Sequence, residues 1–227
     1  MKIIVNECQF EKLKDIIKEM AYPSSFNFDE FRDCRTFVER VRYCEARLQR
    51  IASGSSRIVY QVDNEKVLKL AKNQKGIAQN QVEYRLGTEP YYTCFAEIYE
   101  YDEQGLWIEM EFCKKAKKSD FKAIYGVPFE VLCCMIYDMK NNYAYNRYGK
   151  INPYSEYREI VQEIWDGEEN DLQLLFTSVQ EYMGSEMLES IGDLCRPSSW
   201  GINSEGYFTL IDYGLDDDVA KKYYGGR

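Results

Sequence analysis

The side chains that could do acid–base or metal chemistry in this sequence are carboxylates, lysines, tyrosines and cysteines, because the chain contains no histidine. Ser-His-Asp and Cys-His nucleophile systems are therefore excluded. Asp193 opens a loop that also carries Arg196 and Ser199, a composition typical of functional loops. Asp212 follows the apolar run that ends at Ile211, where a carboxylate suits a metal ion. A capping aspartate in a surface loop and an ordinary strand-ending turn are the respective alternatives.

A strand lysine and a helix glutamate form a second candidate pair. Lys69 stands between Leu68 and Leu70, so the alternation of a strand places it on the opposite side from both leucines. A lysine that points inward needs an anionic partner. Glu83, on the helix predicted to follow, is the candidate. An exposed lysine on an edge strand is the alternative.

Two further segments could bind a nucleotide. Gly54, Ser55 and Ser56 form a predicted turn between two strands, where small residues let backbone N–H groups approach a triphosphate. An ordinary hairpin turn is the alternative. A later strand ends at Glu111 and Cys113, whose backbone groups could bind the edge of an adenine ring. A plain core strand is compatible with that role.

The elements that must position these residues are an antiparallel sheet followed by helices. Helices are expected over 10–17 and 29–48, and the hydrophobic period changes to that of strands from Gln49. Strands are expected over 50–53, 57–62, 66–70, 95–101 and 106–112, helices over 77–86, 128–140, 154–165 and 171–188, and a hairpin over 201–202 and 207–211. Strands first and helices later describe an α+β protein.

The composition argues against several classes of protein. The net charge of −9 argues against a nucleic-acid partner, because phosphate contacts need clustered Lys and Arg. The basic run Lys114–Lys118 is interpreted as a solvated linker, with a docking patch as the alternative. No stretch approaches the roughly 18 apolar residues of a membrane span, and the start turns polar too soon for a signal peptide. We therefore expect a cytoplasmic protein without a membrane partner.

The eight cysteines are irregularly spaced, so we expect reduced and mostly buried thiols. No spacing typical of a zinc site occurs.

Taken in order, the candidate segments resemble the protein-kinase signature set of glycine-rich loop, strand lysine, helix glutamate, hinge, catalytic loop and Asp-Phe-Gly metal motif. The match runs from about Gln49 to Leu215. The chain looks particularly similar to small kinase-like proteins of bacterial viruses and prophages. That likeness is carried by residues 54–60, 72–80 and 211–215. The resemblance implies a two-lobed, protein-kinase-like α+β fold, with an N-terminal helical extension (1–48), an N-lobe with an antiparallel sheet (49–113) and a reduced, mainly helical C-lobe (114–227).

The resemblance also implies ATP and Mg²⁺ as cofactors. Lys69 would hold the α- and β-phosphates and pair with Glu83, while Asp212 would bind Mg²⁺. Asp193 would accept the proton of an incoming hydroxyl. Arg196 falls where kinases keep a phosphate-contacting lysine.

The remaining positions follow from the same resemblance. Ser199 takes the place of the metal-binding asparagine when Cys195 is treated as an insertion. The turn 54–56 would cover the phosphates, and Glu111 with Cys113 would form the adenine-binding hinge.

The sequence departs from the kinase pattern at several points. A hydroxyl at Ser199 is a poorer Mg²⁺ ligand than an amide oxygen, Ile191 and Gly192 replace the His-Arg pair, and the loop has a single glycine. Arg227 follows soon after Leu215, so we expect no conventional activation segment and no platform for protein substrates.

Three functions are compatible with these observations. We favour an ATP- and Mg²⁺-dependent phosphotransferase whose acceptor the sequence does not name. The alternative is a pseudokinase-type module that binds a host or phage protein, with or without nucleotide. The third possibility is that the chain is an α+β protein unrelated to kinases.

Overall fold

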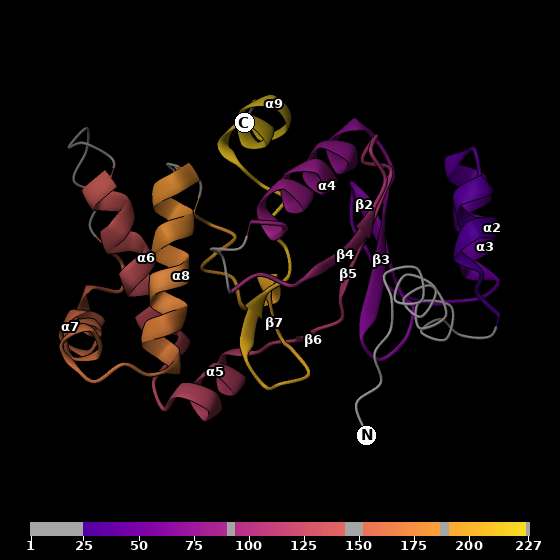
Figure 1. Ribbon diagram of the computed structural model, residues 1–227. Helices are drawn as coiled ribbons and strands as arrows, with labels where there is room; N and C mark the ends of the chain where they lie inside the picture. Colours follow the sequence, from indigo (N-terminus) through magenta and orange to yellow (C-terminus); the bar gives the residue numbers. More distant parts are fainter. Residues whose placement is uncertain (1–24, 90–93, 144–151, 187–190, 226–227) are drawn as a thin grey trace, which may run out of the picture.

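The computed structural model describes residues 25–89, 94–143, 152–186 and 191–225. It has two lobes joined by a small sheet (Figure 1). The strands β1 to β5 form one lobe, and the helices α5 to α8 lie in the other. The helix expected over 10–17 falls outside the described residues. None of the described helices is long and apolar enough to cross a membrane.

The first lobe is built on a five-stranded antiparallel sheet with the strand order β1-β2-β3-β5-β4. Its strands are β1 (Gln49–Ser53), β2 (Arg57–Gln61), β3 (Lys66–Ala71), β4 (Ile98–Tyr101) and β5 (Trp107–Glu111). All five were predicted, and β3 lies between β2 and β5 rather than at an edge. Lys69 pairs with Val59 on β2 and with Ile108 on β5, so these three side chains share one face.

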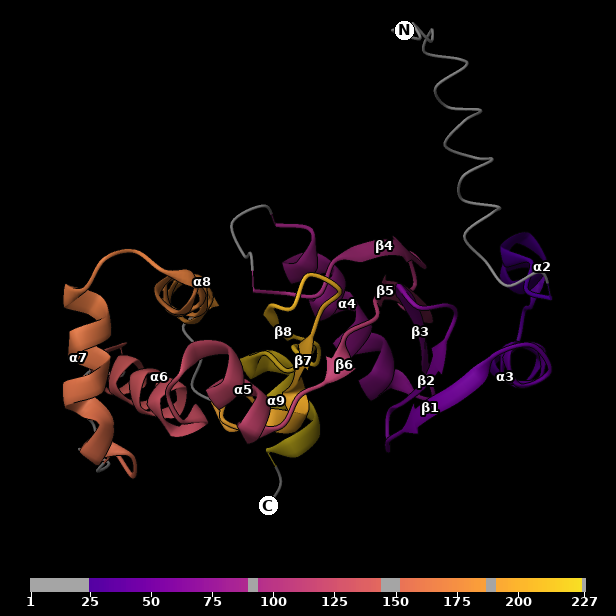
Figure 2. The same ribbon diagram turned by 90° about the horizontal axis from the view of Figure 1, so that it is seen from below.

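The opposite face of the sheet is covered by two short helices, α2 (Phe28–Asp33) and α3 (Phe37–Glu45). Figure 2 shows both beside the sheet. Strand side chains pack there against residues of the helices and of the segment before them, in one apolar cluster. Its buried members are Phe26, Phe31, Cys44, Ile58, Tyr60, Val62, Leu68, Leu70 and Trp107.

The prediction of one helix over 29–48 was wrong. The chain leaves the helical conformation at Cys34, and Thr36 begins α3 with a reciprocal capping box to Glu39. Phe37 and Val38, the first two residues of α3, have 36% and 53% of their surface exposed. The break re-aims the second helix, so the apolar residues on either side of it do not form one stripe.

Helix α4 (Gln74–Gly87) connects β3 to the segment before β4 and packs against β3 and β5. It extends the helix predicted over 77–86 in both directions. Asn73 caps its first turn by accepting from the Gly76 N–H at 3.2 Å. Glu83 of this helix is completely buried.

The second lobe is mainly helical. Its helices are α5 (Lys118–Tyr125), α6 (Phe129–Tyr143), η1 (Ser155–Tyr157), α7 (Arg158–Asp166) and α8 (Asp171–Glu186), followed by η2 (Pro197–Ser199). The helices predicted over 128–140 and 154–165 form, and so does the helix predicted from 171, as far as the structure describes it. They contribute to a second and larger apolar core, which extends to residues of β3, α4 and β5.

A three-stranded sheet joins the lobes, with β7 (Trp200–Ile202) between β6 (Lys114–Lys115) and β8 (Phe208–Leu210). The predicted hairpin is therefore confirmed. The basic run is not a simple linker, because Lys114 and Lys115 pair with β7 and Lys118 begins α5. Its lysine side chains are nevertheless exposed. After β8 the chain ends in α9 (Asp217–Tyr224), which packs on α4.

These features confirm the predicted α+β class with an antiparallel sheet at one end. Most of the described cysteines are buried, as expected, and each of the described ones is a free thiol. Cys8 lies outside the described residues.

Candidate functional site

Lys69 and Glu83 form the predicted ion pair. Lys69 Nζ lies 3.1 Å from Glu83 Oε1 and 3.0 Å from Oε2, and it also donates to the Ile211 carbonyl at 2.7 Å. Lys69 is 6% exposed, so the alternative of an exposed edge-strand lysine is wrong. One ammonium thus connects β3, α4 and the residue before Asp212.

Arg57 belongs to the same cluster and was missed from the sequence. Its Nη1 lies 2.7 Å from Glu83 Oε2, and its Nη2 lies 2.6 Å from Asp212 Oδ1. Arg57 stands two residues before Val59 on β2, so it shares the face of Lys69. Arg57 begins the apolar run of β2, so an argument like that for Lys69, a cation beside apolar strand residues, could have drawn attention to it.

Burial and neighbouring charges shift the pKa values of three side chains in this cluster. Burial lowers the pKa of Lys69, and the Glu83 carboxylate offsets part of that effect. Burial also lowers the pKa of Arg57, but Glu83 and Asp212 outweigh it, so the guanidinium is held fully protonated. Partial burial raises the pKa of Asp212, but the charges of Arg57 and Lys69 lower it by more. The net shift of the Asp212 pKa is therefore downward. The basic groups of Lys69 and Arg57 thus lie against the carboxyl groups of Glu83 and Asp212.

Asp212 is fixed by the backbone at the end of β8. The Ser199 carbonyl accepts from the N–H groups of Ile211 and Asp212, at 2.8 Å and 3.2 Å. These bonds place the two predicted metal-binding positions side by side. Tyr213 is buried, stacks on the Phe95 ring at a centroid distance of 4.3 Å and donates to a backbone carbonyl. The Asp212 side chain keeps 54% of its surface exposed.

Asp193 and Arg196 lie together in the loop before η2. Arg196 Nη1 is 2.7 Å from Asp193 Oδ1, and the Arg196 N–H donates to the Asp193 carbonyl at 3.1 Å. Trp200, which is fully buried, anchors the loop by donating from Nε1 to the Leu194 carbonyl at 2.8 Å. Burial raises the pKa of Asp193; the charge of Arg196 opposes this, and that of Asp212 adds to it. A carboxyl group with a raised pKa in such a loop is suited to proton transfer.

The turn of Gly54, Ser55 and Ser56 is held against the start of α4. Lys72 Nζ donates to the Gly54 carbonyl at 2.6 Å, and Asn73 Nδ2 donates to the Ser55 carbonyl at 3.1 Å. Ser56 Oγ donates to Gln79 Oε1 at 2.6 Å.

Gly76 has no room for a side chain in this arrangement, because a Cβ there would clash with the Ser56 carbonyl. The close approach at Gly76 and the hydrogen bonds of the turn together hold residues 54–56 against α4 and the residues before it.

Glu111 and Cys113 lie at the predicted hinge, where the chain passes from β5 to β6. Burial raises the pKa of Glu111, and it raises that of Cys113 to about 12, with Glu111 adding to the latter shift. Cys113 packs closely on β7, since a Cβ at Gly201 would lie 2.5 Å from the Cys113 Cβ. The backbone of β7 therefore approaches the hinge directly.

The donors at Asp212 fit a metal ion that arrives with phosphates better than a preformed metal cage. The described residues contain no group of three or more carboxylate or thiolate side chains that could hold an ion. Mg²⁺ is usually held by one or two carboxylates together with substrate phosphates and water. The half-exposed Asp212 carboxylate meets that lesser requirement, whereas Ser199 is 3% exposed and approaches Asp212 through its backbone carbonyl.

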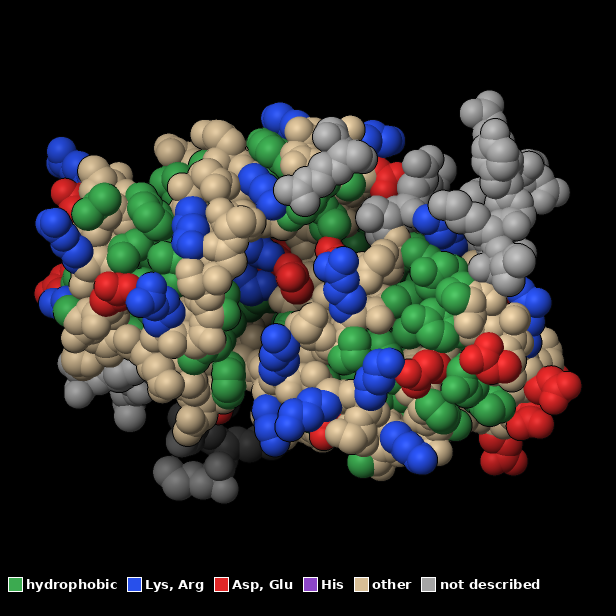
Figure 3. All heavy atoms as spheres, turned by 180° about the vertical axis from the view of Figure 1, so that it is seen from behind, with side chains coloured by type: hydrophobic (Ala, Val, Ile, Leu, Met, Phe, Trp, Pro, Cys, Tyr) green, Lys and Arg blue, Asp and Glu red, His purple; other side chains and the backbone are tan. Residues whose placement is uncertain are grey.

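The space-filling view shows an opening lined by charged side chains. Figure 3 shows the molecule hollowed between the two lobes, with Lys or Arg and Asp or Glu side chains next to one another in the hollow.

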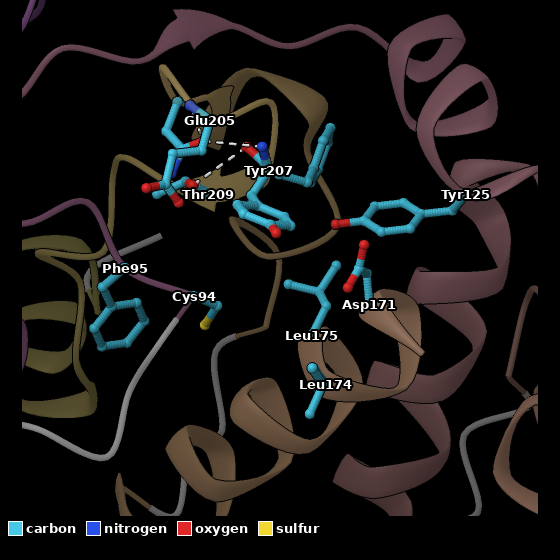
Figure 4. A pocket seen from close by; sticks show the side chains of 11 residues that line it. Cys94, Phe95, Tyr125, Asp171, Leu174, Leu175, Glu205, Tyr207 and Thr209 are labelled. Carbon is cyan, nitrogen blue, oxygen red and sulfur yellow. Dashed lines mark hydrogen bonds between the residues drawn. The ribbon is translucent and has the colours of Figure 1, made fainter. Parts of the chain in front are cut away.

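A separate cavity of about 310 Å³ lies between α5, α8, the β7–β8 hairpin and the segment before β4. Tyr125, Asp171 and Tyr207 point toward one another around it (Figure 4). Phe95 also lines this cavity and stacks on Tyr213, so the cavity adjoins the packing behind Asp212.

Comparison with known proteins gives similarity in structure only. No family model matches the chain, and no curated protein matches it. The ternary complex of APH(2'')-IIa with streptomycin and ATP is 10% identical, with a TM-score of 0.37 over 80% of this chain and 71% of that one. ADP-bound aminoglycoside phosphotransferase APH(2'')-Ib is 11% identical, with a TM-score of 0.36 over 74% of this chain and 65% of that one.

Choline kinase LicA from Streptococcus pneumoniae is 12% identical, with a TM-score of 0.34 over 77% of this chain and 66% of that one. At these identities and TM-scores the likeness concerns the fold alone.

Proposed function

We propose that this chain, which has a two-lobed protein-kinase-like fold, binds ATP with Mg²⁺ beside Lys69 and transfers the γ-phosphate to an acceptor hydroxyl. The observation that carries the proposal is the position of Lys69 Nζ, which is bonded to both Glu83 and the Ile211 carbonyl. Kinases assemble their phosphate site from a strand lysine, a helix glutamate and a metal-binding aspartate. Here all three lie in one cluster, with Arg57 joining Glu83 to Asp212.

Each residue has a distinct task in the proposed reaction. Lys69 contacts the α- and β-phosphates, and Asp212 with Ser199 would hold Mg²⁺, which neutralises phosphate charge when bound. Asp193 accepts the proton of the acceptor hydroxyl. The hydroxyl oxygen forms the bond to the γ-phosphorus, and the bond from that phosphorus to ADP breaks so that ADP leaves. Arg196, which is bonded to Asp193, offers positive charge to the transferred group.

Two observations favour a second candidate, a module that binds a partner protein and has no transfer activity. The turn at 54–56 is bonded to α4 and the segment before it, and Asp212 is paired with Arg57. Both arrangements would have to loosen for the metal and the phosphates to enter fully. A module that uses the fold only to hold a partner would not need that change.

Transfer of labelled γ-phosphate from ATP distinguishes the two functions, with small alcohols, sugars and the protein itself as acceptors. Asp193→Asn is nearly isosteric, so it should preserve nucleotide affinity and lower transfer by roughly 10²–10⁴-fold, as expected for loss of a general base. Ser199→Asn should raise transfer if the hydroxyl is only a weak metal ligand. Robust transfer that Asp193→Asn leaves unchanged would contradict the assignment of the base.

A further inference from the structure

Arg57 lies in the site but has no task in the phosphate transfer described above. Its side chain is only 9% exposed, and two charge-assisted hydrogen bonds compensate the burial of its charge. One runs to Glu83 and the other to Asp212, at 2.7 Å and 2.6 Å. Asn80 Oδ1 lies 3.4 Å from its Nη1.

The two acids held by this guanidinium come from segments far apart in the chain. Glu83 belongs to α4 of the first lobe, whereas Asp212 follows β8 of the sheet that joins the lobes. A planar guanidinium can bind two carboxylates at once with fixed geometry, which a lysine ammonium does less well. Arg57 therefore connects helix α4 to the end of β8.

The charge on Asp212 explains why this connection matters. An unpaired carboxylate at this place would repel the phosphates of a nucleotide, and a cation beside it removes the repulsion. In the structure Arg57 supplies that cation at 2.6 Å. A divalent ion bound at Asp212 would have the same electrostatic effect, so the two cations compete for one carboxylate.

We propose that Arg57 is a positioning residue that neutralises Asp212 while no metal is bound, and that it thereby limits how strongly nucleotide binding depends on Mg²⁺. The nucleotide part of this inference rests on the proposed function. The pairing of Arg57 with Asp212 in the free protein does not depend on it.

The test compares ADP affinity in EDTA with ADP affinity in Mg²⁺, by calorimetry, for the wild type and Arg57→Gln. Removing the guanidinium weakens binding in EDTA, because Asp212 then repels the phosphates, and it strengthens the contribution of Mg²⁺. The dissociation constant in EDTA divided by that in Mg²⁺ should be about tenfold larger for Arg57→Gln than for the wild type. This lies within the usual range of coupling between two ligands. Arg57→Lys keeps the charge without the planar guanidinium, so its ratio should lie between those of the wild type and Arg57→Gln.

A second measurement needs no nucleotide. Urea unfolding of the free wild type, Arg57→Gln, Asp212→Asn and the double variant forms a thermodynamic cycle. If the pair acts as proposed, the double variant loses less stability than the sum of the single variants. Additive losses would overturn the pairing.

The outcomes separate this inference from the proposed function. Wild-type binding with an unchanged Mg²⁺ ratio in Arg57→Gln would overturn the inference and leave the proposed function intact. Absence of ADP binding in every variant would count against the proposed function, and the cycle in urea would then decide whether Arg57 and Asp212 are coupled.

Discussion

The ammonium of Lys69 lies 3.0 Å from the Glu83 carboxylate, and Glu83 is fully buried. The same carboxylate oxygen also lies 2.7 Å from Arg57 Nη1. One buried acid thus serves two buried cations. Loss of the acid and loss of either cation should therefore have unequal effects on stability.

The first prediction follows from this inequality. Glu83→Gln leaves two cations close together in the interior, and breaking a buried pair in this way typically costs about 3–5 kcal/mol. Lys69→Met leaves Glu83 paired with Arg57, so the loss should be clearly smaller. The free energy of unfolding in urea measures both. An equal or larger loss in Lys69→Met would show that Arg57 does not compensate Glu83.

A second prediction concerns acid stability. The pKa of Asp212 is lowered in the folded protein from its usual value of 3.8. The ionised carboxylate therefore stabilises the fold above its unfolded pKa, and this contribution disappears as the pH falls through the lowered folded value. Because the side chain is 54% exposed, solvent screening will make the effect modest.

The matching measurement compares wild type and Asp212→Asn in thermal melts between pH 7 and pH 2. The wild type should be the more stable at neutral pH, and the difference should vanish at the acid end. A difference that does not change with pH would contradict the lowered pKa.

Much of the fold followed from sequence patterns because they are local. The alternation around Lys69 placed it on the face opposite Leu68 and Leu70, and the strands and most helices followed from their hydrophobic period. The break between α2 and α3 was also visible in principle, since Thr36 and Glu39 have the spacing of a capping box. The apolar residues on both sides of the break suggested one continuous helix and hid this signal.

The rest depended on contacts between distant segments. The packing of the 54–56 turn on α4 requires Gly76 beside the Ser56 carbonyl, and no local pattern indicates that approach. The bond from Arg57 to Asp212 joins residues far apart in the chain. Arg57 could have been noted as an isolated strand cation, but its second partner could not have been named.

The third prediction tests how the turn is held. Gly76→Ala should destabilise the protein by about 1–3 kcal/mol, the usual range for overpacking, because the new Cβ would clash with a backbone oxygen. Gly54→Ala is the matched control, since a Cβ there meets nothing within 4 Å. Urea unfolding of the two variants should differ in this direction. Equal stabilities would mean that the turn does not pack on α4 as described.

A fourth prediction concerns the C-terminal helix α9. Arg85 lies 3.3 Å from Asp216, and the Lys75 ammonium lies 3.9 Å from the centre of the Tyr224 ring. These contacts hold α9 on the helix that carries Glu83. Tyr224→Ala should therefore increase hydrogen exchange of the first turn of α4, where Lys75 lies, whereas Tyr224→Phe, which keeps the ring, should not. Unchanged exchange in Tyr224→Ala would show that α9 does not support α4.

The most direct test of the proposed function is calorimetric titration of ATP with Mg²⁺ into the wild type and Lys69→Met, each confirmed to be folded. We predict saturable binding at one site in the wild type, weakened at least about tenfold in Lys69→Met, a loss of roughly 1.4 kcal/mol that is modest for a charge-assisted phosphate contact. At 100 times the dissociation constant, ATP should also stabilise the wild type by about 2.7 kcal/mol. Absence of binding, or binding that Lys69→Met leaves unchanged, would contradict a nucleotide site at Lys69.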